Sequence, residues 1–146
     1  MNRYIFIIFV SLLIFIGFIF FFHKSEKIIG VEIGRKVFFV IIRDTEKGRE
    51  NGLSFWADLA DNQGMLFIFS TPDKYGFWMK DMTFPIDIIW IDENMKIIHI
   101  EKSVLPETYP KVFYPETESL YVLEVSAGQS DVLDLRVGDG VKMIKK

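Results

Sequence analysis

Residues 76–92 read GFWMKDMTFPIDIIWID, in which charged residues stand among some of the heaviest apolar side chains of the chain. The segment Ile86–Ile91 is rich in isoleucine and predicts a β-strand. Side chains alternate between the two faces of a strand, and here both faces would be apolar apart from Asp87. A strand with two apolar faces belongs in the middle of a sheet, so this stretch predicts a central strand with a largely buried Trp90.

Asp87 is the anomaly of this strand. A carboxylate inside a sheet must find hydrogen-bond donors or a cation, or else remain protonated. Lys80 is the obvious cation for Asp87, or for Glu124, which stands in another apolar run. We predict that the three residues form a structural network that closes the sheet. Asp87 is expected to have a structural role before any role in a binding site. The alternative is a ligand site or an active site, for which the longer side chains of Glu124 and Lys80 are better suited.

Apolar and β-branched runs separated by turn-forming residues continue on both sides of this strand. Gly34-Arg35 between two such runs predicts a β-hairpin, and Thr45 is a candidate N-cap for one short helix over residues 46–55. The predicted strands are Ile28–Ile33, Lys36–Ile42, Met65–Phe69, Phe77–Met79, Ile86–Ile91, Met95–Glu101, Tyr121–Val125 and Val141–Ile144. Short strands with a single helix indicate a mainly β domain, either a sandwich or a barrel-like fold.

The N-terminus predicts a membrane anchor. Tyr4–Phe22 contains no charged residue and has about the length that a helix needs to cross a bilayer. No A-x-A-like cleavage site follows it, which favours an uncleaved anchor over a secretory signal peptide. Only Arg3 precedes the run and a long domain follows it, which resembles a signal anchor with the domain outside the cytoplasm. We therefore predict a single transmembrane helix within an anchor and juxtamembrane segment, residues 1–27, followed by a β domain, residues 28–146.

Composition excludes several classes of function. The 146 residues include 17 Lys and Arg against 20 Asp and Glu, for a formal net charge of -3. No basic cluster is present, so nucleic acid is not expected as a partner. The absence of cysteine excludes cysteine-based catalysis and thiolate metal sites. The two histidines have no ligand spacing and no calcium-loop pattern occurs, so we predict no metal site and no cofactor.

Five stretches resemble, in order and approximate spacing, the successive motifs of the DUF192 family, also called UPF0127. They are Gly52-Leu53, residues 64–69 (GMLFIF), residues 77–80 (FWMK), residues 85–89 (PIDII) and residues 122–128 (VLEVSAG). The resemblance covers residues 31 to about 144. It implies a small, mainly β domain, often exported or membrane-attached in bacteria and archaea, whose biochemical role is not established.

Two short stretches depart from the family pattern. Asp81-Met82 stands where the family often has Asn-Thr, and Ser54-Phe55 stands where a Met and then an Arg are frequent. These departures argue against a role for an amide at position 81 and against an arginine site just after the predicted helix.

Two classes of function remain open. The first, which we favour, is a membrane-tethered binding or interaction module for a small ligand, an envelope polymer or a protein segment. The second is a hydrolase or lyase of the cell envelope that uses two carboxylates. No catalytic residue is assigned, because no nucleophile, metal or partnered base is recognisable. The candidate ligand-binding residues are Trp78, Lys80, Asp87, Glu124 and Arg49, the last only if it points toward Lys80.

Overall fold

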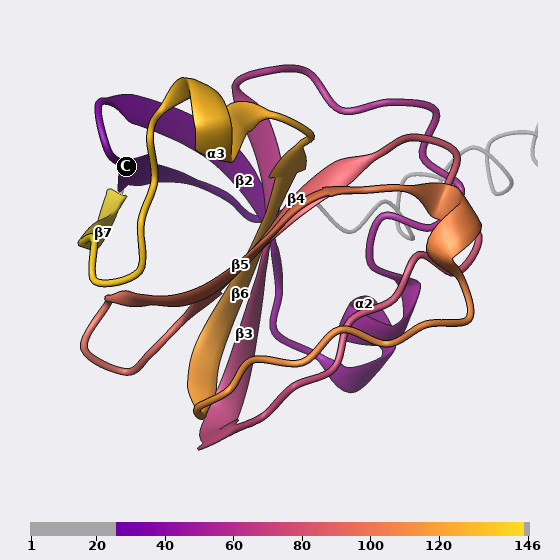
Figure 1. The fold of residues 1–146 in the computed structure, drawn as a ribbon. Coiled ribbons are helices and arrows are strands. Elements are labelled where there is room, and N and C mark those ends of the chain that lie inside the picture. Colours follow the sequence, from indigo (N-terminus) through magenta and orange to yellow (C-terminus); the bar gives the residue numbers. More distant parts are fainter. Residues whose placement is uncertain (1–25, 145–146) are drawn as a thin grey trace, which may run out of the picture.

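Seven strands form one curled sheet in the order β5-β4-β6-β3-β2-β1-β7 (Figure 1). The structure is a computed structural model that describes residues 26–144. The strands are β1 (Ile28–Ile33), β2 (Lys36–Arg43), β3 (Gln63–Asp73), β4 (Ile86–Ile91), β5 (Ile97–Val104), β6 (Ser119–Ser126) and β7 (Val141–Ile144). The prediction of a mainly β domain is confirmed, and the sheet is a half-barrel rather than the two packed sheets of a sandwich.

The curl brings the two edge strands of the sheet together at one end. Lys96, just before β5, and Gly140, just before β7, form an isolated bridge. The N–H of Ile97 donates to the carbonyl of Asp139 at 2.9 Å. Side chains from both edge strands therefore share one apolar core inside the curl. This inner core consists of Val31, Ile33, Phe38, Val40, Leu66, Ile89, Ile91, Ile97, Leu123, Val125, Leu135 and Val141.

A second core lies on the outer face of the sheet, over β4, β6 and β3, where connecting segments cover the strands. This outer core consists of Leu53, Leu59, Met65, Phe67, Met79, Ile86, Ile88, Trp90, Val104, Phe113 and Val122. Strand β4 contributes to both cores, because its alternate side chains point into one or the other and all six of its residues are buried. The predicted central strand and the burial of Trp90 are confirmed.

Short helices lie in the connections between the strands. They are α2 (Glu46–Asn51), the 3₁₀ helix η1 (Pro106–Thr108) and α3 (Gln129–Val132). Thr45 caps α2 as predicted, since its hydroxyl accepts the N–H of Gly48 at 3.2 Å. The helix ends earlier than predicted because Gly52 turns the chain with a φ of 47°. The expectation of only one helix is wrong, since single turns such as η1 and α3 have too few residues to show helical periodicity.

The strand predictions hold for the β1–β2 hairpin and fail in two other places. Phe77–Met79 is not a strand, since Phe77 pairs only with Phe113 in an isolated bridge. Strand β5 begins at Ile97 rather than Met95, which has a φ of 60° and therefore lies in a turn. The Asp92 carboxylate accepts two backbone N–H groups of this turn, which fixes it.

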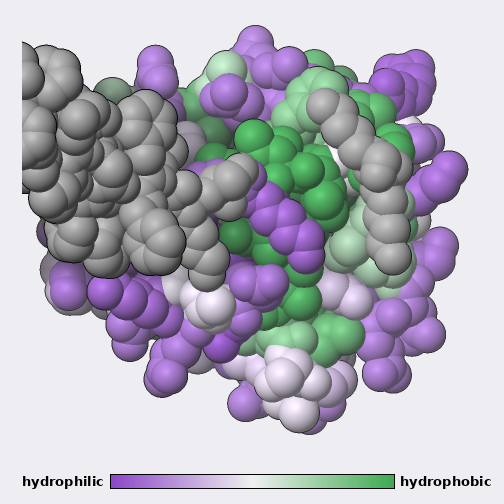
Figure 2. Space-filling view, turned by 180° about the vertical axis from the view of Figure 1, so that it is seen from behind, coloured by the Kyte–Doolittle hydropathy of each residue, from purple (hydrophilic) through white to green (hydrophobic). Residues whose placement is uncertain are grey.

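The outer face of the sheet is covered only in part. Figure 2 shows the molecule from behind, where hydrophobic residues gather in the middle of the visible face beside hydrophilic ones. Large apolar side chains of the β1–β2 hairpin remain exposed, namely Ile28, Val37 and Phe39.

The predicted membrane anchor, Tyr4–Phe22, lies outside the described residues. Within residues 26–144, no helix has the length and apolar character needed to cross a bilayer. The anchor therefore stays a prediction from the sequence.

Candidate functional site

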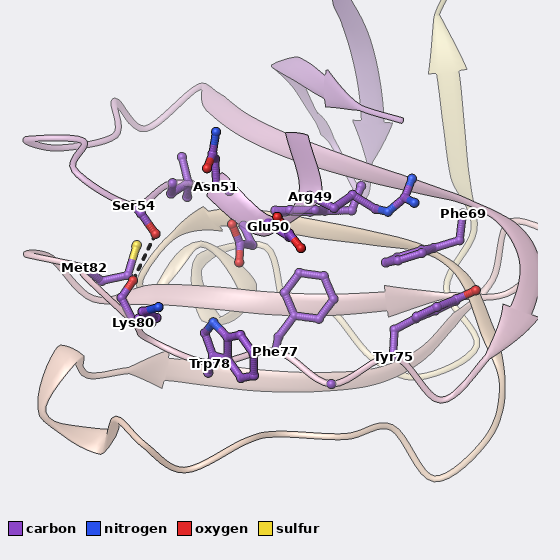
Figure 3. Close-up of a pocket in the computed structure, with 15 residues that line it drawn as sticks. Arg49, Glu50, Asn51, Ser54, Phe69, Tyr75, Phe77, Trp78, Lys80 and Met82 are labelled. Carbon is purple, nitrogen blue, oxygen red and sulfur yellow. Dashed lines mark hydrogen bonds between the residues drawn. The ribbon is translucent and has the colours of Figure 1, made fainter. Parts of the chain in front are cut away.

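A pocket of about 150 Å³ opens on the outer face of the sheet, beside the outer core (Figure 3). Helix α2 with the turn after it, the end of β3 with the segment that follows, and β6 supply its walls. The lining residues are Arg49, Glu50, Asn51, Gly52, Leu53, Ser54, Phe67, Phe69, Tyr75, Gly76, Phe77, Trp78, Lys80, Met82 and Glu124.

Glu124 is the buried acid of this pocket. Its side chain lies on the outer face in a row with Met65 of β3 and Ile88 of β4, its cross-strand partners. Only 5% of the residue is exposed, and its Oε2 has no hydrogen-bond partner among the described residues. Burial raises the pKa of the Glu124 carboxyl from 4.5 to about 8, because the charged form loses its hydration. At neutral pH Glu124 is therefore mostly a neutral acid that can both donate and accept a hydrogen bond.

Arg49 of α2 forms one end of the pocket. Its Nη1 donates to the carbonyl of Ile68 at 3.0 Å, and its guanidinium lies 5.0 Å from the centroid of the Phe69 ring. The Phe69 ring stacks in turn on Tyr75, with 3.4 Å between the centroids, and Figure 3 shows the three side chains layered. A stacked and hydrogen-bonded guanidinium has few other positions, so these contacts fix a positive charge at the pocket.

Two loops meet at the mouth of the pocket. The Ser54 hydroxyl donates to the carbonyl of Lys80 at 3.0 Å, and the Phe55 N–H donates to the carbonyl of Asp81 at 3.1 Å. Phe55 and Asp81 both adopt positive φ angles, 66° and 56°. Such angles are uncommon for residues that carry a side chain, although Met95, Ser103 and Asp134 adopt them elsewhere in the described chain. The two stretches that depart from the DUF192 pattern are therefore in contact, at the pocket mouth.

Trp78 and Lys80 line the pocket near this mouth. Trp78 is 51% exposed, so its ring is available to a ligand. Lys80 is exposed as well, and within residues 26–144 it forms no ion pair. The predicted pairing of Lys80 with Asp87 or Glu124 is therefore wrong, and its charge remains available at the pocket.

Asp87 does not belong to this pocket. Its cross-strand partner on β6 is Val125 of the inner core, whereas the partner of Glu124 on β4 is Ile88 of the outer core. Directly opposed residues of neighbouring strands share a face. The carboxyl groups of Asp87 and Glu124 therefore point to opposite faces of the sheet.

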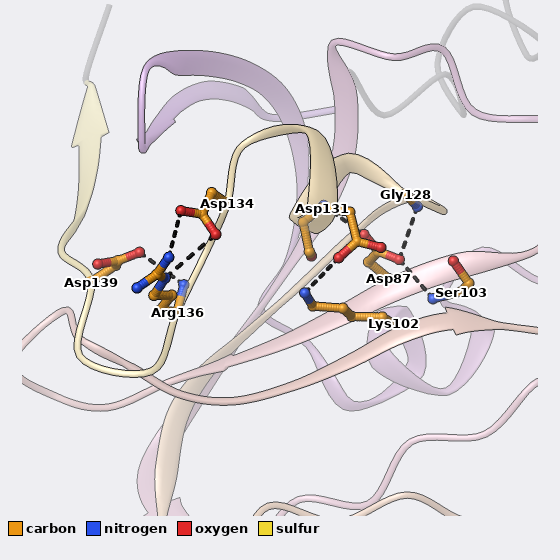
Figure 4. Close-up of polar contacts among 9 residues, drawn as sticks. Asp87, Lys102, Ser103, Gly128, Asp131, Asp134, Arg136 and Asp139 are labelled. Atoms are coloured by element: carbon orange, nitrogen blue, oxygen red, sulfur yellow. Dashed lines mark hydrogen bonds and ion pairs between the residues drawn. The ribbon is translucent and has the colours of Figure 1, made fainter.

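Backbone N–H groups surround the Asp87 carboxylate (Figure 4). Its Oδ1 accepts the N–H groups of Ser103 and Gly128 at 2.8 and 3.1 Å, and its Oδ2 accepts the N–H of Ser130 at 2.7 Å. These bonds tie the end of β5 and the start of α3 to β4. They are the contacts of a structural residue, although the partners are these backbone groups and not Lys80.

Four of the five candidate residues from the sequence thus lie together at the pocket, namely Arg49, Trp78, Lys80 and Glu124. Sequence reasoning missed most of the aromatic lining, which comprises Phe67, Phe69, Tyr75 and Phe77. The 16% aromatic content was the available signal. It does not separate a pocket wall from a core, because aromatic residues of a β domain are expected inside.

The fold and the site define a class of protein: a small half-barrel domain with an aromatic-lined pocket that contains a buried acid on its outer face. The chain belongs to the DUF192 family, described as "Uncharacterized ACR", which matches residues 22–143. Four of the five motif stretches quoted above contribute to the pocket lining, and the remaining one, residues 85–89, contains Asp87.

Two crystal structures are similar to the domain. A protein of unknown function from Novosphingobium aromaticivorans has a TM-score of 0.77 and 28% sequence identity, covering 82% of this chain and 88% of that chain. A "putative transcription regulator" from Sinorhizobium meliloti has a TM-score of 0.78 and 26% identity, covering 83% of this chain and 97% of that chain. No curated protein matches the chain.

Proposed function

We propose that this protein is a membrane-tethered binding module that holds a small ligand in the pocket over Glu124. The observation that carries the proposal is the buried Oε2 of Glu124, which has no partner within residues 26–144. A buried polar group without a hydrogen bond costs stability. A ligand that forms a hydrogen bond with this carboxyl group would offset the cost, so binding is favoured at Glu124.

The charges around the pocket favour a ligand with a carboxylate or carboxamide end. Glu124 as a neutral acid can donate its O–H to such a group. Arg49 and Lys80 add two positive charges, of which the exposed Glu50 offsets one. The Trp78 ring offers a flat apolar surface for the rest of the ligand.

A hydrolase or lyase that uses Asp87 with Glu124 gains no support from this geometry. A two-carboxylate mechanism requires both groups at one scissile bond, whereas these two point to opposite sheet faces. The oxygens of Asp87 are also already engaged by backbone donors. We therefore keep the binding role.

Three probes that share a benzene ring test the ligand chemistry: benzoate, benzamide and benzylamine. We expect the first two to shift the backbone amide NMR signals of the pocket in the full chain, and benzylamine to bind more weakly. Benzoate affinity should fall up to about tenfold per pH unit above the pKa of Glu124, because only the protonated acid is competent. Glu124→Gln keeps a donor but cannot ionise, so its benzoate affinity should not change with pH. The same pH profile in both proteins would contradict the proposal.

The tether is the part of the proposal that rests on the sequence. Tyr4–Phe22 would anchor the chain with residues 28–146 outside the cytoplasm. Fusions of alkaline phosphatase, and separately of a fluorescent protein that fails to mature after export, to the C-terminus test the orientation. We expect phosphatase activity only. Fluorescence without phosphatase activity would reverse the orientation, and release of a soluble mature form would overturn the uncleaved anchor.

A further inference from the structure

Half of the outer sheet face, over β2, β1 and β7, is covered within residues 26–144 only where the segment with Trp56 borders Ile28, Phe39 and Ile41. The strand register places Ile28 opposite Ile41, and Ile41 beside Met65 of the outer core. Ile28 and Ile41 therefore lie on the outer face, and so do Gly30 and Phe39, which are opposed two residues along the same strands.

Apolar side chains dominate this half. We name it the hairpin face, which consists of Ile28, Val37, Phe39, Ile41 and Ile144. Ile28 is 55% exposed and Phe39 is 48% exposed. Figure 2 shows hydrophobic residues gathered among hydrophilic ones on the surface seen from behind. A contiguous exposed apolar patch marks an interaction surface more often than it marks idle surface.

The hairpin face is closely packed within itself. Gly30 lies at its centre, and a Cβ added there would be 3.3 Å from atoms of both Val37 and Ile144. The missing side chain thus lets these two residues approach each other. The half-buried Trp56 borders the hairpin face on the other side, where it lines a groove of about 80 Å³ with Ile28 and Phe39.

Charged pairs flank the hairpin face at both ends. At the Ile28 end, where β1 begins, Arg43 and Glu26 form an ion pair at 2.6 Å. Glu32 and Lys142 are opposed across β1 and β7 nearer the other end. The apolar side chains of the hairpin face therefore lie between two charged pairs.

The chain before β1 indicates what lies next to the Ile28 end. Phe22, the last residue of the apolar run, precedes Ile28 by only a short connection, which reaches at most about 20 Å when extended. A domain of this size is roughly 35 Å across. If Tyr4–Phe22 crosses the bilayer, the Ile28 end of the domain must therefore stay near the lipid surface. Lys24 and Lys27 in the connection favour anionic headgroups.

We propose that the hairpin face docks on the lipid bilayer through its Ile28 end, with Phe39 and Trp56 in the interfacial region. The inference rests on the anchor of the proposed function and is independent of the ligand pocket. Apolar and aromatic side chains flanked by lysines are the composition that inserts at this depth. The domain then lies on the membrane instead of moving freely at the end of its tether.

Single-cysteine labelling tests this docking directly, because the chain has no cysteine of its own. The full chain is placed in vesicles of phosphatidylcholine and phosphatidylglycerol with an environment-sensitive fluorophore at Phe39→Cys. A matched control is Val137→Cys, which replaces a 66% exposed residue in the connection that enters β7 at the end far from Ile28. Leu13→Cys reports on the anchor. Nitroxide-bearing lipids then quench any label that lies in the bilayer.

We expect strong quenching at position 13, at least about twofold more quenching at position 39 than at position 137, and little at position 137. Quenching at position 13 with equal, weak quenching at positions 39 and 137 would overturn the docking while leaving the anchor intact. A label at position 39 that is shielded from water but not quenched by lipid would also overturn it, in favour of coverage by protein. No quenching at position 13 would overturn the anchor and the docking together.

Discussion

Asp87 and Glu124 are buried carboxyl groups on adjacent strands, yet their surroundings differ in every respect that matters for function. Asp87 points into the curl and accepts three backbone N–H groups. Glu124 points outward among apolar side chains, with one oxygen unpaired within residues 26–144 and a pKa raised to about 8. Burial is common to both, so burial alone does not mark a site.

The partners decide what each carboxyl group contributes. Asp87 satisfies donors that would otherwise be buried without acceptors, so it stabilises the fold. Glu124 is easier to protonate in the folded chain than in the unfolded chain, so at neutral pH it lowers stability relative to an unperturbed acid. A residue that costs stability and faces a pocket is better explained by binding than by folding.

The first prediction concerns how tightly the outer core is packed. Trp90 is fully buried in the outer core, and its indole N–H donates to the carbonyl of Tyr75 at 2.8 Å. Trp90→Ala should cost about 3 to 5 kcal/mol, the usual range for deleting a large buried aromatic side chain. Urea denaturation of the two proteins measures the difference. A change below about 1 kcal/mol would mean that this face is not tightly packed and that Glu124 is hydrated.

The second prediction concerns the pH dependence that Glu124 confers. Below pH 4.5 its carboxyl is protonated in both states, and between 4.5 and about 8 only the folded state keeps the proton. Stability should therefore fall as pH rises through this window, by roughly 5 kcal/mol at most, and level off above it. Denaturation at several pH values should show this slope in the parent and a shallower one in Glu124→Gln, which should be the more stable protein at pH 9. Parallel profiles would refute the assignment.

The third prediction concerns the structural role of Asp87. Asp87→Ala leaves three backbone N–H groups without this acceptor, among them that of the buried Ser130, and should cost about 2 to 4 kcal/mol. Asp87→Asn keeps the shape and one acceptor oxygen, so it should cost less. Neither change should alter the benzoate affinity of the folded protein. A protein with Asp87→Ala that melts like the parent but no longer binds benzoate would move Asp87 into the site.

The smallest effect on stability is expected at Lys80. It is exposed and without an ion pair in the described chain, so Lys80→Ala should change the unfolding free energy by less than about 0.5 kcal/mol. It should nevertheless weaken benzoate binding several-fold, because a positive charge is removed from the pocket. Lys74→Ala, at another exposed lysine outside the pocket lining, is the control. Equal benzoate affinity in both variants would remove Lys80 from the site.

Much of the fold could be predicted because its strands carry local signals. Ile86–Ile91 and the hairpin at Gly34-Arg35 combine β-branched residues with clear turns, so they were predicted correctly. The choice between a sandwich and a half-barrel depends on strand order, which pairs β4 with β6 and β2 with β3 across long stretches of chain. No local pattern specifies such pairings. The aromatic residues of Phe77–Met79 favour a strand, but Phe77 and Trp78 line the pocket and Met79 is buried in the outer core.

Site residues could be predicted where a charged residue interrupts an apolar stretch of the sequence. Lys80 and Glu124 were singled out in this way, and so was Asp87, although only two of the three share the pocket. What separates Asp87 is the register of β4 on β6 and the turn before α3, which supplies its donors. Neither can be read from the residues around Asp87 itself.

A carboxyl ¹³C titration of Glu124, with and without benzoate, tests whether Glu124 is a buried neutral acid that binds the ligand. The account predicts a pKa of about 8 for the Glu124 carboxyl in the free protein. It predicts a further rise when benzoate is bound, because the protonated form of Glu124 donates to the ligand. A Glu124 carboxyl that titrates near 4.5, and whose pKa benzoate leaves unchanged, would contradict both its burial as a neutral acid and its role in binding.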